Sequence, residues 1–339
     1  MKPFLLKPTC KNYLWGGQKL RNYGKISDSD NIAESWELSC HPDGESVIAS
    51  GRFKGMTLSQ FLEENPDSLY LHREENYFPV LVKFIDACGK LSIQVHPDNA
   101  YAQIHENDAG KMEVWYVVEA EPHASIIYGF QEQMNPEKLR SAVADGTLPN
   151  YVKTIPVKKG DIIFIPAGTL HSINEGVMVV EIQQNSNTTY RIYDYQRKDN
   201  NGNLRPLHLE KAIDVLNFEP CEIPEVSNSN HIEGWVSTTL ANTEYFLATL
   251  WKADDENSVF CFGGYQGFGD IDCFSHILVL EGEGIVTLYD GETIPLKKGD
   301  SFFIPADSMQ GEITGKLTFI CTDNYNPDDE FEFEADFDF

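Results

Sequence analysis

An internal repeat constrains the fold of this 339-residue chain more than any other feature. Residues 155–167 contain the sequence IPVKKGD followed by FIPA, and residues 294–306 contain IPLKKGD followed by FIPA at the same offset. Each copy predicts a strand, a Lys-Gly-Asp turn and a second apolar strand. The chain is long enough for two units, each with its own core. The repeat therefore predicts two related β-rich units.

The remaining sequence also predicts mainly strands. Residues 4–24 and 32–50 are rich in short strand patterns, 78–84 and 91–95 are typical of buried strands, and 235–325 consists almost entirely of short strands between Gly, Asn and Asp turns. We therefore predict a mainly β fold of two jelly-roll barrels with a few short helices. The first unit spans 1–220, a linker rich in Pro, Ser and Asn follows at 221–230, and the second unit spans 231–339.

Four segments predict the short helices. Thr57 caps a helix that ends near Asn65, and Asp98 lies near the start of a helix at 97–106. Asn135 caps a third helix, which Gly146 ends. An apolar stripe predicts a fourth helix at 205–218.

Four potential metal ligands lie in the first unit. Gln94 and His96 are two residues apart, so on a strand they point to the same face, while Glu113 and His171 come from later strands. These nitrogen and oxygen donors suit zinc or a similar divalent ion. A position left to water or substrate would make the site catalytic rather than structural.

The second copy of the repeat lacks these donors. His171 aligns with Gln310, and Glu113 falls opposite Ser275. Duplication explains the shared turns, but packing does not require donors in one copy alone. The sequence therefore predicts one divalent ion per chain, held by the first unit, and no metal ligands in the second.

Composition excludes several classes of function. A formal net charge of −27 argues against a nucleic-acid-binding surface, and an acidic enzyme that acts on an anion must concentrate its few cations at the site. Seven scattered cysteines without a Cys-x-x-Cys pair are typical of reduced thiols, mostly in the core. Because the chain shows neither signal-peptide features nor an apolar run that could cross a bilayer, we expect a cytoplasmic protein without a membrane partner.

Seven motifs in a fixed order resemble those of a known enzyme family. They are YLWGG at 13–17, AESWE at 33–37, FPVLVK at 78–83, LSIQVHPD at 91–98, GKMEVWY at 110–116, PAGTLH at 166–171 and RIYD at 191–194. The chain resembles the type I mannose-6-phosphate isomerases, double-cupin enzymes, in their shorter bacterial form. The resemblance implies interconversion of mannose 6-phosphate and fructose 6-phosphate. Gln94, His96, Glu113 and His171 match the family's zinc ligands. The helical insertion of the longer relatives is reduced here to the helix at 135–146 and its flanks.

This chemistry needs a base, a group that stabilises an oxyanion, and an anchor for phosphate, because a proton moves between C1 and C2 through a cis-enediol. Arg191 is the best fixed positive charge for an enediolate, and the family places its catalytic arginine there. Lys111 and Glu181 are the candidate proton carriers, and the sequence does not decide between them. For the phosphate of the hexose substrate, the resemblance points to Ser92 and Lys83.

Simpler interpretations exist for these residues. Gln94 could satisfy backbone groups, and His171 could be an ordinary turn histidine. Arg191 could pair with Asp194 or Glu181, and Lys83 could extend its stem along apolar surface. Other residues are expected to be structural or at the surface: His105, His123, His208, His276, Trp15 and Trp36. The last twelve residues alternate Phe with Asp and Glu, which indicates an edge strand or a solvated tail, and no loop spacing supports calcium binding.

Two other classes of function remain open from the sequence. A sugar-binding or regulatory cupin would lack a proton carrier, which the joint presence of Lys111, Glu181 and Arg191 disfavours. A metal-dependent oxygenase would prefer iron with histidine-rich ligation, which one Gln and one Glu beside two His disfavour. The oligomeric state and the pathway cannot be inferred.

Overall fold

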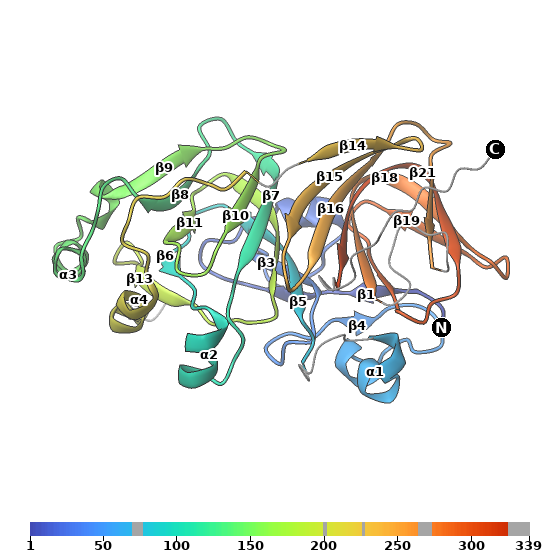
Figure 1. Cartoon of the computed structure of the whole chain (residues 1–339), viewed down its shortest axis with the longest axis horizontal. Helices are drawn as coiled ribbons and strands as arrows, with labels where there is room; N and C mark the ends of the chain where they lie inside the picture. Colours follow the sequence, from blue (N-terminus) through green and yellow to red (C-terminus); the bar gives the residue numbers. More distant parts are fainter. Residues whose placement is uncertain (70–76, 199–201, 226–227, 264–272, 325–339) are drawn as a thin grey trace, which may run out of the picture.

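The computed structural model describes residues 1–69, 77–198, 202–225, 228–263 and 273–324. Two β-rich units lie side by side along the long axis of the molecule (Figure 1). The predicted mainly β class is confirmed. The strands form separate sheets, however, and not the closed barrels that we expected. The acidic, Phe-rich tail lies outside the described residues.

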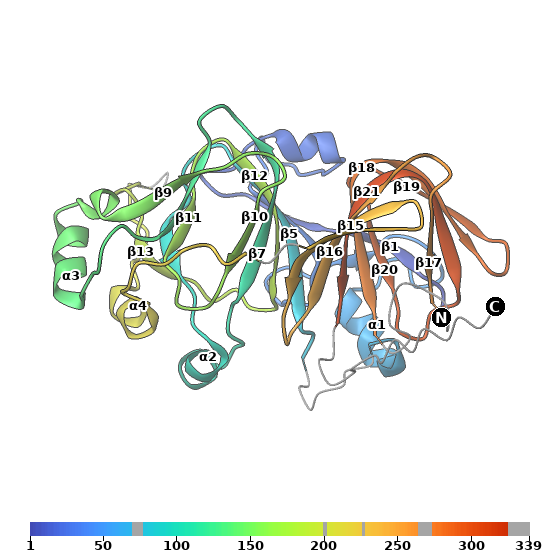
Figure 2. The ribbon, with the colours of Figure 1, turned by 45° about the horizontal axis from the view of Figure 1, so that its top comes forward.

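The first unit is a sandwich of two antiparallel sheets (Figure 2). One sheet has the order β10-β7-β12-β5-β3-β2 and comprises β2 (Thr9–Lys11), β3 (Glu34–Leu38), β5 (Val80–Ala87), β7 (Glu113–Ala120), β10 (Ile162–Ile165) and β12 (Val177–Gln184). The other has the order β13-β6-β11-β8-β9 and comprises β6 (Ile93–Val95), β8 (Ser125–Phe130), β9 (Val152–Pro156), β11 (His171–Ile173) and β13 (Tyr190–Tyr193). Trp115 of the first sheet and Ile126 of the second belong to the core between them.

The second unit is built on one ten-stranded sheet. Its strands are β1 (Phe4–Lys7), β4 (Val47–Ile48), β14 (Ser229–Ile232), β15 (Trp235–Asn242), β16 (Leu247–Ala253), β17 (Val259–Phe262), β18 (Ser275–Leu288), β19 (Thr293–Lys297), β20 (Ser301–Ile304) and β21 (Gly311–Asp323). Strands β1 and β4 lie within the range predicted for the first unit, yet β1 pairs with β20 and β4 pairs with β1. The N-terminal strands therefore complete the sheet of the second unit.

The two copies of the repeat adopt the same local structure. In each copy the Asp carboxylate accepts a hydrogen bond from the backbone N–H three residues earlier, at 2.8 Å for Asp161 and 2.9 Å for Asp300. The preceding glycines, Gly160 and Gly299, have φ angles of 92° and 87°, a region that glycine enters without strain. The predicted strand–turn–strand unit is thus confirmed in both copies.

Helices are short and lie outside the sheets. They are α1 (Leu58–Glu64), α2 (Asn99–His105), α3 (Pro136–Ala144), α4 (Leu209–Val215) and the 3₁₀ turns η1 (Lys19–Tyr23), η2 (Pro66–Ser68) and η3 (Leu148–Asn150). The predicted caps are confirmed, because the side chains of Thr57, Asp98 and Asn135 each accept a hydrogen bond from a backbone N–H of the first turn.

The fourth predicted helix is shorter than expected. It begins at Leu209 and not near Arg205, because Pro206 disfavours helical backbone at the residue before it. The His208 backbone N–H also donates to the Arg191 carbonyl at 2.7 Å, which ties this segment to β13. Residues 205–208 therefore form a connection that lies against the five-stranded sheet.

Alternation along the central strands separates two environments. Val82, Val114 and Val180 point to the core that joins the two units, which also contains Phe274 and Phe303 of the second unit. Their neighbours Lys83, Glu113 and Glu181 therefore point to the opposite face, into the first unit. The same strands thus bind the units together and carry the charged side chains of the site.

Two further expectations concern the surroundings of the protein. Among the described residues, no helix is long and apolar enough to span a bilayer. All seven cysteines are free thiols, but only Cys273 and Cys321 are buried and Cys88 is exposed, so the expectation that most of them fill the core was wrong. The cytoplasmic location stays a prediction.

Candidate active site

Three buried side chains that can bind a metal converge inside the first unit. They are His96, Glu113 and His171, whose ligand atoms all lie within 4.8 Å of one another. His96 follows β6, Glu113 begins β7 and His171 begins β11, so three strands contribute. Among the residues that the structure describes, this is the one group of three such side chains.

Strand register explains how residues far apart in sequence meet. Gln94 of β6 pairs with His171 of β11 on one side and with Arg191 of β13 on the other. These three residues therefore form a row across the five-stranded sheet. Glu113 comes from the opposite sheet, where it pairs with Ile165. The cluster thus lies between the two sheets of the sandwich.

Both histidines present the same ring nitrogen to the centre of the cluster. His96 Nδ1 lies 3.0 Å from the Thr188 carbonyl oxygen, and His171 Nδ1 lies 2.8 Å from that of Thr169. Because a carbonyl only accepts, each Nδ1 carries the proton and each Nε2 presents a lone pair. Burial lowers the pKa of His96 well below its usual value and that of His171 to about 4, so both rings are neutral.

The distances in the cluster fit a divalent metal ion. The two Nε2 atoms are 3.1 Å apart, and Glu113 Oε1 and Oε2 lie 3.2 Å from His171 Nε2 and 3.5 Å from His96 Nε2. Ligands at about 2.0–2.2 Å from zinc lie roughly 2.8–3.5 Å from one another. Lys111 Nζ lies 3.0 Å from Oε2, yet neither buried carboxylate oxygen accepts a hydrogen bond. Such unsatisfied oxygens favour a bound cation.

Gln94 adjoins this cluster without yet offering its oxygen. Its Nε2 lies 3.4 Å from His171 Nε2, while its Oε1 accepts a hydrogen bond from Ser92 Oγ at 3.2 Å. A half-turn of the amide group exchanges the two atoms and brings Oε1 to the histidines. Gln94 is therefore within reach of the cluster, and Ser92 lies beside it.

Alternating charges extend from the cluster across the six-stranded sheet. Lys111 Nζ lies 4.0 Å from Glu181 Oε1, and Lys83 Nζ donates to Glu181 Oε1 at 3.1 Å and to Gln183 Oε1 at 2.7 Å. Trp115 Nε1 donates to Glu181 Oε2 at 2.9 Å. Burial alone would raise the pKa of Glu181, but Lys111 and Lys83 hold it at about 2. Glu181 is therefore an ionised carboxylate, held in place by Lys83, Trp115 and the nearby Lys111.

The pKa of Glu113 is shifted in the opposite direction from that of Glu181. Burial, reinforced by the carboxylate of Glu181, raises the pKa of Glu113 to about 7 despite the nearby Lys111. A divalent cation between Glu113 and the histidines would favour the ionised form. Lys111 therefore stabilises the ionised form of Glu113 only in part, and a cation bound by this donor set would complete that stabilisation.

A cavity of about 230 Å³ opens beside the cluster. Its wall includes six of the nine residues that the sequence predicted for the site, namely Lys83, Ser92, Gln94, Lys111, Glu181 and Arg191. The other three, His96, Glu113 and His171, are fully buried behind it. The structure therefore brings all nine predicted residues to one place.

Arg191 is only partly satisfied by protein groups. Its Nη1 donates to the Pro206 carbonyl at 2.9 Å, whereas its buried Nε has no hydrogen-bond partner. Asp194, which the simpler interpretation offered as its ion-pair partner, is bound instead by Arg197 and lies 3.6 Å from Arg205 Nη1. Arg191 therefore keeps donor capacity at the cavity wall.

The cavity also contains residues that sequence reasoning did not select. Arg205 and Glu34 line it, as do Tyr13 and Trp15, whose rings stack at 5.5 Å. Tyr13 and Glu34 belong to motifs that resemble the family, which was the available signal. Arg205 had no such signal, because it belongs to none of those motifs.

The residues set aside as structural or surface groups lie outside the cavity wall, apart from Trp15. His105 stacks on Tyr101 at the surface, and His123 is exposed. His208 Nδ1 accepts a hydrogen bond from the Arg191 backbone N–H, and His276 is buried in the second unit against Ser301. Trp36 is fully buried.

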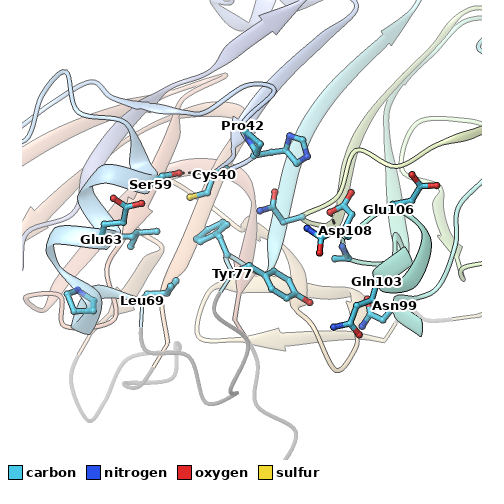
Figure 3. A pocket seen from close by; sticks show the side chains of 17 residues that line it. Cys40, Pro42, Ser59, Glu63, Leu69, Tyr77, Asn99, Gln103, Glu106 and Asp108 are labelled. Carbon is cyan, nitrogen blue, oxygen red and sulfur yellow. Dashed lines mark hydrogen bonds between the residues drawn. The ribbon is translucent and has the colours of Figure 1, made fainter. Parts of the chain in front are cut away.

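A larger groove of about 1210 Å³ lies away from this chemistry (Figure 3). Its wall combines Cys40, Ser59 and Tyr77 with Asn99 and Asp108, and none of the nine predicted site residues contributes to it. Figure 3 shows its carboxylates spread along the wall rather than converging. We therefore place the candidate active site in the smaller cavity.

Comparison with known proteins shows which proteins this chain resembles. The family model "Phosphomannose isomerase type I, catalytic domain" matches residues 4–122, and "Mannose-6-phosphate isomerase, cupin domain" matches residues 237–324. The chain is similar to mannose-6-phosphate isomerase ManA of Bacillus subtilis, with 39% identity over 95% of this chain and 98% of the relative. It is also similar to the mannose-6-phosphate isomerase of Streptococcus mutans, with 36% identity over 95% of this chain and 98% of the relative. A crystal structure of the mannose 6-phosphate isomerase from Bacillus subtilis matches with a TM-score of 0.86 at 34% identity, covering 95% of this chain and 99% of that one.

Proposed function

Because the chain belongs to the type I mannose-6-phosphate isomerases, we propose that it interconverts mannose 6-phosphate and fructose 6-phosphate through a cis-enediol with one bound zinc ion. The observation that carries this proposal is the buried cluster of His96, Glu113 and His171 beside a cavity with charged walls. Family membership favours an isomerase over the sugar-binding cupin and the oxygenase, the two alternatives left open by the sequence.

His96, Glu113 and His171 would hold the metal ion, with Gln94 as a fourth ligand once its oxygen faces the cluster. When bound, a divalent ion orders the oxygens of the sugar and polarises its carbonyl. The protein contributes two neutral imidazoles whose Nδ1 atoms are fixed by backbone carbonyls, an arrangement that orients metal-binding histidines. The mixed nitrogen and oxygen donors suit zinc.

Lys111 and Glu181 are the two candidates to carry the proton between C1 and C2. Both line the cavity, and the 4.0 Å between Lys111 Nζ and Glu181 Oε1 allows either to face the same edge of the sugar. In the forward direction a base removes the proton from C2 of the aldose, and the same proton or its replacement is delivered to C1 of the enediol. Lys83 and Trp115 hold the Glu181 carboxylate in place.

Arg191 would stabilise the enediolate. Its position beside Gln94 in the sheet places a guanidinium on the wall of the cavity, and this positive charge favours a developing oxyanion. Ser92 and Lys83 are the phosphate ligands that the family resemblance implies, and both line the cavity. These roles are proposals that mutagenesis can separate.

A coupled assay that follows the formation of fructose 6-phosphate from mannose 6-phosphate tests the proposal. We expect activity in the purified protein, loss after treatment with a chelator, and recovery when zinc is added back. Metal analysis of the purified chain should find one ion per chain. Absence of isomerisation by the zinc-loaded protein would contradict the proposed function.

A further inference from the structure

Three arginines and one carboxylate are grouped beside the cavity. Arg197 binds Asp194 in a close ion pair, and Arg205 Nη1 lies 3.6 Å from the same Oδ1 atom. Arg191 is on β13, which ends at Tyr193, directly before Asp194, and it lines the cavity together with Arg205. The group has three positive charges and one negative charge, an excess of two.

This excess of positive charge is unusual in a chain with a net charge of −27. Burial and the neighbouring Arg205 lower the pKa of Arg191, which reflects repulsion between the two guanidiniums. The two acidic residues of the cavity wall are both on the six-stranded sheet and have other partners: Glu34 accepts a hydrogen bond from Trp36 Nε1 at 2.7 Å, and Glu181 accepts one from Lys83 Nζ at 3.1 Å. A phosphate monoester, with a charge of about −1.5 to −2, would balance the excess.

The connection that carries Arg205 is held in place on the cavity side. Arg191 Nη1 donates to the carbonyl of Pro206, and the Arg191 backbone N–H donates to His208 Nδ1. Helix α4, which follows this connection, lies beside β13 (Figure 1). Arg205 therefore reaches the cavity from a segment that is bound to the strand of Arg191, so the two guanidiniums are positioned together.

We propose that Arg205 binds the phosphate group of the substrate and sets the preference of this site for a phosphorylated sugar. This inference deepens the proposed function and rests on it. The phosphate of a hexose 6-phosphate is at the opposite end of the carbon chain from C1 and C2. Arg205 lines the same cavity but is outside the row of His171, Gln94 and Arg191 that adjoins the metal cluster.

The other cation assigned to the phosphate is already paired. Lys83 is buried and its ammonium donates to Glu181 and Gln183, so it adds little net charge for a dianion. Arg205, by contrast, has a side chain that is 28% exposed and makes a longer ion pair. A guanidinium also binds two phosphate oxygens at once, which an ammonium cannot do with the same geometry.

A purely structural role for Arg205 would be the simpler interpretation. Arg197 already donates to Asp194, and partly exposed ion pairs contribute little to stability. The Arg205→Gln variant should therefore keep the melting temperature of the wild type while losing affinity for phosphate. The Arg205→Lys variant keeps the positive charge but lacks the planar guanidinium, and it should recover part of the affinity for phosphate.

The test measures binding of mannitol 6-phosphate, which has the phosphate but no carbonyl to isomerise, to the zinc-loaded wild type and variants by calorimetry. We expect Arg205→Gln to raise Kd by about tenfold to a hundredfold, the loss of a hydrogen-bonded charge. Arg140→Gln, on α3 and bound to Glu210 outside the cavity, is the matched control and should bind like the wild type. In assays with mannose 6-phosphate, Arg205→Gln should raise KM more than it lowers kcat.

An unchanged Kd for Arg205→Gln, or equal weakening by Arg140→Gln, would overturn the inference. Failure of the proposed function would look different, because a wild type that binds mannitol 6-phosphate but does not isomerise mannose 6-phosphate would contradict the isomerase reaction alone. If Arg205→Gln unfolds at a lower temperature, Arg205→Lys decides. A wild-type Kd for that folded variant together with a wild-type KM would then show that only positive charge is needed, which contradicts binding of two phosphate oxygens by the Arg205 guanidinium.

Discussion

Glu113 and Ser275 occupy equivalent positions in the two halves of the chain, since Glu113 pairs with Ile165 of the first repeat and Ser275 with Ile304 of the second. The backbone of the second half is thus preserved where the carboxylate has been replaced by a hydroxyl. Ser275 Oγ donates to Asp323 at 2.5 Å instead of facing two histidines. This relationship places the predicted metal chemistry in one half only.

We therefore expect one zinc ion per chain and its loss in the variant His171→Ala. Activity should disappear, while the circular dichroism spectrum stays close to that of the wild type, because the sheets do not depend on this ring for pairing. Metal content can be measured by mass spectrometry. His105→Ala, at the surface, is the control and should keep both metal and activity. Full zinc occupancy in His171→Ala would contradict the proposed ligand set.

Arg191→Ala is expected to lower kcat by roughly two to three powers of ten, the scale of losing one oxyanion stabiliser, with a much smaller change in KM. The reason is that the enediolate carries its charge only during the reaction, so the guanidinium helps the transition state more than the bound sugar. Steady-state kinetics with mannose 6-phosphate measure both constants. A change in KM alone would make Arg191 a phosphate ligand instead.

Ser92→Ala should raise KM with little effect on kcat, because a phosphate ligand acts in the ground state and the transition state alike.

Lys83→Met should raise KM and also lower the free energy of unfolding by about 3–5 kcal/mol, because it leaves the buried Glu181 carboxylate without its closest cation. Urea unfolding measures the second effect. The double variant Lys83→Met with Glu181→Gln should recover stability but not activity, and its failure to do so would contradict the ion-pair explanation.

The stability of the wild type should fall as the pH falls below 6.5, in part because of His276. Burial lowers the pKa of His276 in the folded protein to about 3, whereas the unfolded chain binds this proton near pH 6.5. Between these values unfolding takes up a proton, so this residue contributes a loss of up to about 1.4 kcal/mol per pH unit. His276→Gln should show a shallower dependence in urea unfolding between pH 6.5 and 5. An exposed control, His123→Asn, keeps the buried ring of His276 and should show the wild-type slope.

Local signals were sufficient for much of the fold. The side chains of Thr57, Asp98 and Asn135 cap helices where the sequence predicted them, because a cap depends on a few neighbouring residues. The strand–turn–strand repeat follows from turn chemistry in the same way. The helix predicted at 205–218 was too long, because a hydrogen bond from His208 to the Arg191 carbonyl, 17 residues earlier in sequence, competes with the first helical turns.

The sequence by itself determined the β class, the repeat, the caps and the nine candidate site residues, since these are read from periodicity, local motifs and family resemblance. Only the tertiary structure decided that β1 joins the second sheet, that the sheets stay open, and that Arg205 reaches the cavity. The physical reason is that strand pairing and sheet packing depend on contacts between residues far apart in the chain. Glu113 meets His171 across 58 positions of sequence, and no local preference specifies that the two sheets carrying them pack face to face.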